Sequence, residues 1–194
     1  MKGAAGAQAA SEAAPRGGAA GEARPASLDA LVSQVRERLG AEWLPAVYRE
    51  RIMTMRTRSH PVPVPVAAVS APVEVLHTLL GIELKVGRRR VSCPDLATAR
   101  YLSVFARLGV ESVAVPYDIT KISRAADELE SAWQRTLLLA DHLSEGRAAS
   151  FRTRVRAAVK REVKREIEEA GAGAAIPQFN QNTRQRPRRA QPGE

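Results

Sequence analysis

Apolar residues follow a helical period in several parts of this 194-residue chain. Near the start of the patterned region, one helical face is made by Leu28, Leu31, Val32, Val35 and Leu39. Ser27 precedes this face as an N-cap, and Gly40 follows it as a helix-ending residue. The pattern therefore predicts an amphipathic helix from Ser27 to Leu39.

The clearest pattern lies in residues 94–143, where it predicts a helix, a strand and a second helix. Asp95 offers a cap for the first helix, and Gly109 ends it. Residues 110–115 are mostly apolar and suit a short buried strand, because proline follows them directly.

The second helix of this region begins at a cap on Asp118 or Thr120 and continues to Leu143. Seven side chains form its apolar stripe: Ile122, Ala126, Leu129, Trp133, Leu137, Ala140 and Leu143.

Residues 82–86 and 90–93 alternate apolar and polar side chains on either side of Gly87. This alternation predicts a β-hairpin that carries three arginines near its tip. A right-handed crossover through the following helix would place strand 110–115 parallel to residues 91–93.

Three stretches before the hairpin are less regular. Residues 41–58 fit a helix to about Met55, or alternatively a strand over residues 51–58. Prolines alternate with valines in residues 61–66, which favours an extended connector or a sheet edge over a central strand. Residues 70–80 have apolar positions that predict another helix, ended by glycine.

Together these elements predict an α/β (α+β) fold with a small mixed sheet, a helical N-terminal part and a basic C-terminal helix. The terminal segments contain too few large apolar residues to pack, so we expect them to be disordered. The expected divisions are a disordered arm at 1–26, a helical part at 27–81, an α/β core at 82–146, a basic amphipathic helix at 147–170 and a disordered tail at 171–194.

The chain is strongly basic, with a formal net charge of +9 and 25 arginines against 5 lysines. Such a balance favours a nucleic acid, an acidic protein or a membrane surface as a partner. No run reaches the roughly 18 apolar residues of a spanning helix, and the single cysteine suits a reducing compartment. We therefore predict a cytoplasmic protein that is not inserted in a membrane.

Cations concentrate in three segments that we predict to bind phosphate groups. On helix 147–170, several cations lie four residues apart, and like charges at that spacing repel one another. A bound polyanion would relieve that repulsion. The predicted contacts are Arg88, Arg89 and Arg90 at the hairpin tip; Arg152, Arg154, Arg156, Lys160, Arg161, Lys164 and Arg165 on the helix; and Arg184, Arg186, Arg188 and Arg189 in the tail. RNA is favoured over DNA as the ligand, and we expect the protein to be associated with a ribonucleoprotein.

A protein partner is the alternative to a nucleic acid. An apolar residue recurs every fourth position on the basic helix, which gives a narrow seam rather than a broad core face. If this seam faces another subunit of a larger complex, the contacts are Phe151, Val155, Val159, Val163 and Ile167. The apolar stripe from Ile122 to Leu143 could face a partner in the same way, so that the chain docks through both of its C-terminal helices.

No arrangement of residues indicates catalysis, so we predict that the protein is not an enzyme and needs no cofactor. Cys93 precedes a helix N-terminus, which favours a reactive thiolate, but its place in a strand favours core packing. The three histidines are scattered, and none has a partner at the spacing of a metal site. Glycine-rich phosphate loops are also absent from the sequence.

Residues 92–127 resemble the Alba-type chromatin and RNA-binding proteins. The resemblance lies in Pro94 opening a helix, Gly109 closing it, the strand ending in residues 113–115, and the segment 122–127. It implies a related α/β scaffold and binding to nucleic acid. The chain departs from the family where it has Ser92 and Cys93 in place of paired lysines, and where Asp118-Ile119-Thr120 replaces a basic loop.

Overall fold

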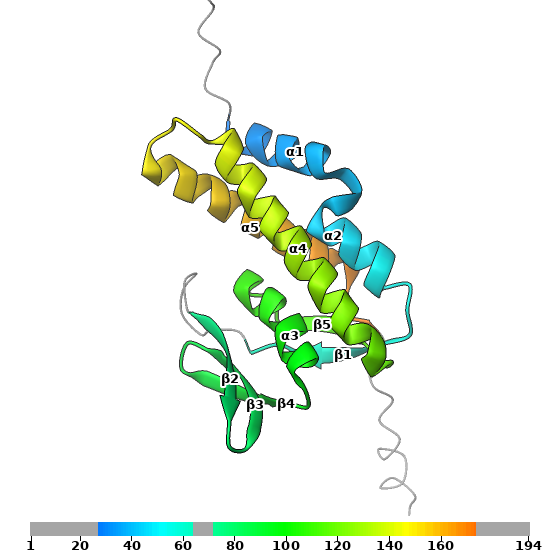
Figure 1. Ribbon diagram of the computed structural model, residues 1–194. Helices are drawn as coiled ribbons and strands as arrows, with labels where there is room; N and C mark the ends of the chain where they lie inside the picture. The colour runs from blue at the N-terminus through cyan, green and yellow to red at the C-terminus, as the bar shows by residue number, and fades with distance from the viewer. Residues whose placement is uncertain (1–26, 64–71, 174–194) are drawn as a thin grey trace, which may run out of the picture.

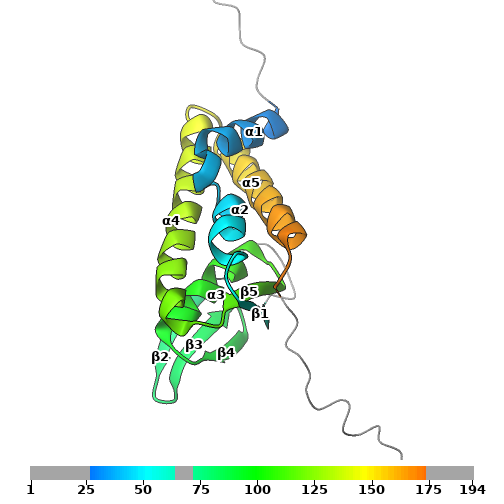
Figure 2. The same ribbon diagram turned by 90° about the vertical axis from the view of Figure 1, so that its right-hand side faces the viewer.

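The computed structural model describes residues 27–63 and 72–173, and two long helices frame this part of the chain (Figure 1). Helix α4 (Ile119–Leu143) leads into a short connection, and α5 (Ala149–Ala170) returns beside it. Figure 2 shows α1 (Leu28–Leu39) across the connected end and α2 (Leu44–Val47) between the two long helices.

Two small antiparallel sheets lie toward the other end of this frame. The first pairs β1 (Thr57–Pro61) with β5 (Ser112–Pro116). The second is a meander of β2 (Val73–Thr78), β3 (Gly81–Val86) and β4 (Arg89–Cys93). The predicted α+β class and the predicted hairpin at residues 82–93 are therefore confirmed.

Helix α3 (Leu96–Leu108) lies between the meander and α4 and contributes the centre of the core. The rings of Tyr101 and Phe105 on α3 have their centroids 5.2 Å apart, and Phe105 packs edge-on against Tyr48 at 5.5 Å. Buried residues from the N-terminal helices, both sheets and α5 join this single cluster. All the helices thus share one core with the sheets.

The predicted parallel pairing of residues 110–115 with residues 91–93 is wrong, because β5 instead pairs antiparallel with β1. The other edge of β5 is closed by two tyrosine hydroxyls. The Tyr48 hydroxyl accepts from the Ala114 N–H at 2.8 Å, and the Tyr101 hydroxyl donates to the Ala114 carbonyl. These bonds take the backbone groups that a parallel neighbour would need.

The helix predicted at residues 70–80 is also wrong, because residues Val73–Thr78 form strand β2. Val73 and Val75 stand opposite Val86 and Leu84 of β3, so the apolar side chains alternate with period two. The glycine at position 81 has φ 122° and completes the turn between β2 and β3 instead of ending a helix.

Residues 41–58 contain both a helix and the start of a strand, the two structures that the sequence allowed. A π-helical turn, Tyr48–Ile52, extends α2, so the helix stops before Met55, and β1 begins at Thr57. Strand β1 has a single neighbour, as expected for a strand leading into alternating prolines. Residues 64–66 lie outside the described residues.

The predicted caps are confirmed. Ser27 accepts a hydrogen bond from the Ala30 N–H at 3.1 Å, and Asp95 accepts one from the Thr98 N–H at 2.7 Å. Asp118 is the cap of α4, where it accepts from the Thr120 N–H at 3.0 Å. These local bonds explain why the helix boundaries follow the sequence closely.

Candidate nucleic-acid interface

Helix α5 packs its apolar seam into the core of its own chain. Val155, Val159 and Val163 are fully buried, and Ile167 is 1% exposed. Phe151 is half-buried beneath the guanidinium of Arg147, which lies 5.5 Å from the ring centroid. The seam is therefore an intramolecular face, and the prediction that it faces another subunit is wrong for the folded chain.

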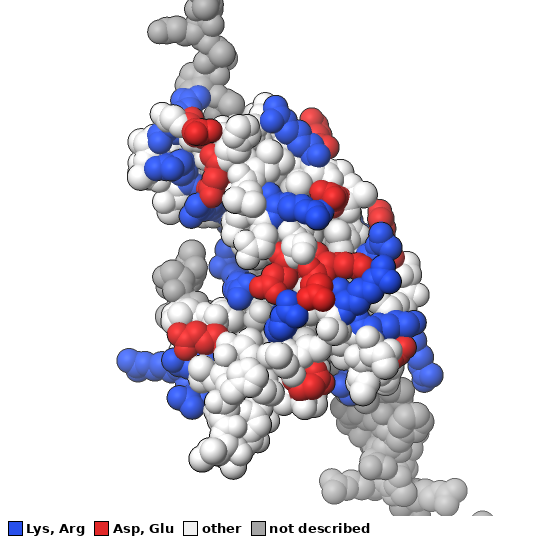
Figure 3. All heavy atoms as spheres, viewed as in Figure 1, with Lys and Arg blue, Asp and Glu red and all other residues white. Residues whose placement is uncertain are grey.

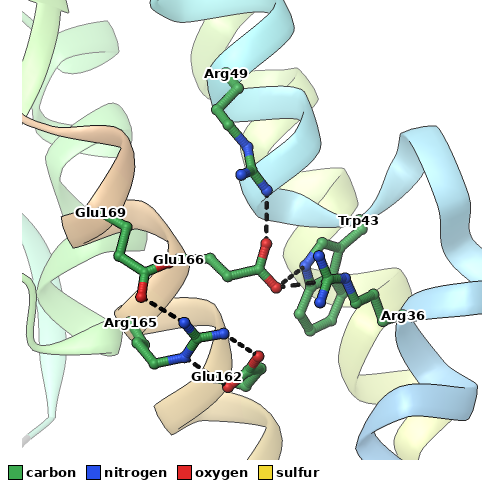
Figure 4. Close-up of polar contacts among 7 residues, drawn as sticks. All are labelled: Arg36, Trp43, Arg49, Glu162, Arg165, Glu166 and Glu169. Atoms are coloured by element: carbon green, nitrogen blue, oxygen red, sulfur yellow. Dashed lines mark hydrogen bonds and ion pairs between the residues drawn. The ribbon is translucent and has the colours of Figure 1, made fainter.

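A buried carboxylate fixes how α5 is oriented (Figure 4). Glu166 on α5 is 2% exposed and accepts the indole N–H of Trp43 at 3.1 Å. Arg49 binds the other carboxylate oxygen at 2.6 Å, and Arg36 approaches at 3.6 Å. This network joins α5 to α1 and to the segment around α2, so it determines which side of α5 faces solvent.

From residue 162 onward, α5 pairs its cations with its own acids. Arg165 lies between Glu162 and Glu169 and forms ion pairs with both, as Figure 4 shows. The Arg165 guanidinium also lowers the pKa of Glu162 from its ordinary value. Lys164 lies 3.6 Å from Glu168. These two predicted phosphate contacts are thus occupied within the helix.

Arg156 is also occupied, because it forms two hydrogen bonds with the Asp141 carboxylate of α4, both at 2.5 Å. The same contact lowers the pKa of Asp141. This pair connects the two long helices near their junction, so its role is to hold them together.

The stretch from Arg147 to Arg161 is different, because no acid occurs between residues 146 and 161. Within the described residues, five cations of this stretch have no ion-pair partner; we call them the α5 basic surface: Arg147, Arg152, Arg154, Lys160 and Arg161. Arg154 and Arg161 lie on one stripe of the helix, and Arg152 and Lys160 lie on another. Four of them are exposed, and Lys160 is half-buried.

Two further features make additional positive charge unfavourable at the α5 basic surface. The helix begins at Ala148 without a side-chain cap and has no acid in its first turn, so its N–H groups add positive charge. Burial lowers the pKa of the Lys160 ammonium, and the nearby Lys164 charge lowers it further. Both features disfavour cations here and would be relieved by an anion.

The hairpin tip is a separate basic group. Arg88 and Arg89 are exposed and have no ion-pair partner in the described part of the chain, whereas Arg90 lies 3.4 Å from Glu83. Figures 1 and 2 place the meander at the end of the molecule away from the α4–α5 connection. The hairpin tip therefore does not extend the α5 basic surface.

The four tail arginines, Arg184, Arg186, Arg188 and Arg189, lie outside the described residues. The last described residue, Gly173, packs against β1 and β5. A Cβ atom built there would be 2.7 Å from Thr57 Oγ1 and 3.1 Å from Ala114 Cβ. The tail therefore starts beside the two-stranded sheet.

Cys93 packs in the core, as the strand pattern predicted. Its thiol lies among buried residues, and its Sγ donates to the Val91 carbonyl at 3.8 Å. Burial raises the pKa of the thiol, and the Asp95 charge raises it further. These effects outweigh the helix N-terminus, so the site does not favour a thiolate. Across residues 27–63 and 72–173, no group of three or more His, Cys, Asp or Glu side chains could hold a metal ion.

Sequence reasoning missed a groove between the segment 41–56 and α4. Among its lining residues are Arg51, Arg56 and Tyr117. Arg56 and Tyr117 are brought together by the β1–β5 pairing, since the Tyr117 N–H donates to the Arg56 carbonyl at 3.1 Å. That pairing joins distant parts of the chain. The groove could therefore have been found from the sequence only if the β1–β5 pairing had been predicted.

No helix in the described ranges has both the length and the apolar composition to cross a bilayer. Comparisons of the chain with protein-family models, with curated proteins and with solved structures found no match. The resemblance of residues 92–127 to Alba-type proteins therefore stays a prediction.

Proposed function

We propose that the protein is a non-enzymatic, cytoplasmic nucleic-acid-binding protein, with RNA favoured over DNA. The observation that supports this function is the α5 basic surface. Its five cations lie in a helical segment without acids, and within the described residues none has an ion-pair partner. Such a surface matches the phosphate backbone of a polyanion.

The proposed contacts neutralise phosphates and carry little sequence information. Lys160 and Lys164 are four residues apart, and the Lys164 charge lowers the pKa of Lys160, so these cations repel each other. A bound phosphate backbone would turn this repulsion into attraction. The hairpin-tip arginines and the tail arginines are additional proposed contacts, which a long nucleic acid could reach from the same protein.

The test is the salt dependence of binding, measured by the fluorescence anisotropy of labelled RNA and DNA of the same sequence. If all five cations contact phosphates, log affinity should fall with log salt at a slope of about −4.5 for duplex DNA and about −3.5 for a single strand. Raising salt from about 50 to about 200 mM would then weaken binding roughly 100- to 500-fold.

A matched pair of variants separates the α5 basic surface from general charge effects. Arg154→Gln with Arg161→Gln removes two cations without ion-pair partners, so the slope should become shallower by about 1.4 to 1.8. Lys164→Gln with Arg165→Gln removes the same charge from cations already paired within α5, and we expect a clearly smaller change. Equal changes in the two variants, or a flat salt titration of the natural chain, would contradict the proposal.

A subunit that docks through its C-terminal helices is not supported to the same degree. The α5 seam and most of the α4 stripe are buried, including Ile122, Leu129 and Trp133. A partner could reach these side chains only if the helices left the core.

A further inference from the structure

The groove between the segment 41–56 and α4 is continuous. It consists of three adjoining hollows of about 410, 260 and 400 Å³. Arg51 and Glu128 line both the first and the second, and Met55 and Lys121 line both the second and the third. Volumes of this order are typical of ligand sites.

One end of the groove contains an exposed aromatic ring. Tyr117 is 43% exposed at the junction between β5 and α4. The Arg56 guanidinium lies over its ring, 5.1 Å from the centroid. A backbone hydrogen bond of 3.1 Å from the Tyr117 N–H to the Arg56 carbonyl holds the two residues side by side. The ring is therefore held in place on a paired backbone rather than on a free loop.

The charges along the groove differ between its two ends. Arg56 and Lys121 line the Tyr117 hollow, and Arg51 lines the middle hollow next to it. Within residues 27–63 and 72–173, Arg51 and Arg56 have no ion-pair partner, and Lys121 has only Asp118, at 3.8 Å. Asp118 is itself occupied, because it accepts hydrogen bonds from the N–H and hydroxyl of Thr120. This end therefore has cations available for an anionic ligand.

The opposite end is acidic. Its lining has four carboxylates against the cations Arg51 and Arg135. Three of these carboxylates are paired within the described residues: Glu42 with Arg135 at 2.6 Å, Asp127 with Arg100 at 2.8 Å and Glu128 with Arg124 at 2.9 Å. Figure 3 shows the acidic side chains gathered over the middle of α4, with basic side chains around them. An anionic ligand is therefore favoured less at this end than at the Tyr117 end, where the cations outnumber the carboxylates.

We propose that the Tyr117 end of the groove binds single-stranded nucleic acid, one base stacking on Tyr117 while the adjacent phosphates contact Arg51, Arg56 and Lys121. An aromatic platform beside cations is the usual arrangement for holding an unstacked base. An acidic peptide would satisfy the cations but would not stack on the part of the Tyr117 ring that Arg56 leaves exposed.

This inference rests on the proposed function for its class of ligand, but it concerns a different surface. The α5 basic surface would contact the phosphates of any strand, whereas the groove requires a base that is free of its pair. The groove thus predicts a preference for single strands, which the α5 basic surface alone does not.

The experiment measures the binding of one labelled RNA of about ten nucleotides, as a single strand and as a duplex, to the full chain. Tyr117→Leu removes the aromatic ring and keeps an apolar side chain, and Tyr117→Phe is the matched control that keeps the ring. Tyr117→Leu should weaken single-strand binding about 5- to 150-fold. Its duplex binding should stay within about twofold, because paired bases do not reach the ring.

Two further measurements make the result specific. A single strand with 2-aminopurine at its centre should lose fluorescence on binding to the natural chain and to Tyr117→Phe, but not to Tyr117→Leu. Arg56→Gln should weaken single-strand binding and make its salt slope shallower by about 0.7, since one phosphate contact is lost. The thermal midpoints of all three variants show whether each has folded.

The outcomes distinguish this inference from the proposed function. If Tyr117→Leu binds single strands as tightly as the natural chain while Arg154→Gln with Arg161→Gln binds more weakly, the groove inference fails and the α5 basic surface stands. If only Tyr117→Leu binds more weakly, the groove stands and the α5 basic surface fails. If the natural chain binds neither strand form, both are wrong.

Discussion

The contacts of the Glu166 carboxylate predict how its removal changes the stability of the protein, and this prediction requires no ligand. In Glu166→Ala, the buried indole N–H of Trp43, which is 2% exposed, loses its acceptor. A buried unsatisfied donor costs about 1–3 kcal/mol, and the lost methylene costs about 0.8 kcal/mol more. Arg36 and Arg49 are 52% and 46% exposed, so they can regain water when the carboxylate is removed.

The expected loss is therefore about 2–4 kcal/mol, with a midpoint about 1 kcal/mol lower than the roughly 3–5 kcal/mol of breaking a fully buried ion pair. Glu166→Gln keeps an oxygen for the Trp43 N–H and loses only the charge, so about 1 kcal/mol is expected. Urea unfolding followed by circular dichroism measures both values, and an unchanged slope with urea shows that the comparison is valid. A loss below about 0.5 kcal/mol for Glu166→Ala would refute the reasoning, as would equal losses for the two variants.

Three other predictions concern single side chains. Tyr48→Phe removes a hydroxyl that bonds to two backbone groups, so the free energy of unfolding should fall by about 1–3 kcal/mol in urea titrations. Asp141→Asn breaks the pair with Arg156 and should cost less than about 1 kcal/mol at neutral pH, because the pair is partly exposed. Folding lowers the pKa of Asp141. The contribution of Asp141 to the free energy of unfolding is therefore complete above about pH 3.8 and is lost as the pH falls through the folded pKa. The unfolding curves of the variant and the natural chain should then converge in acid. Cys93, being buried with a raised pKa, should react with iodoacetamide slowly at pH 8 in the native chain and rapidly in urea; equal rates would contradict the burial.

The helices were predictable because their signals are local. Ser27, Asp95 and Asp118 each accept a hydrogen bond from an N–H two or three residues later. Gly109 ends α3 in the left-handed conformation, at φ 76°. Such contacts need no knowledge of the rest of the fold, so a single sequence contains them in full.

The sheets were harder because their pairing depends on distant residues. Leu76 and Leu79 lie at a helical spacing from Val73, yet the partner of this stretch is β3, and pairing with it imposes an alternation of two. The pairing of β1 with β5 depends on Tyr48 and Tyr101 closing the opposite edge of β5. No local pattern predicts either arrangement.

The candidate site was predictable in composition but not in its ion pairs. The pairs of Arg165 with Glu162 and Glu169 follow from helical spacing and could have been read from the sequence. Arg156 pairs instead with a carboxylate on another helix, so its loss as a phosphate contact required the fold. The absence of acids between residues 146 and 161 needs only the sequence, and it is the feature on which the proposed function depends.

The order of charges along α5 is the reverse of what its helix dipole favours. Arg147 and Arg152 lie at its N-terminal end, where N–H groups are unpaired, and Glu168 and Glu169 lie in its last turn. Each such charge near a helix end costs about 0.3–1 kcal/mol. The helix is held by its buried seam, with Val155, Val159 and Val163 fully enclosed, so it tolerates this cost. A phosphate backbone on the N-terminal half would make the same cations and N–H groups favourable, and no change of sequence within the seam would be needed.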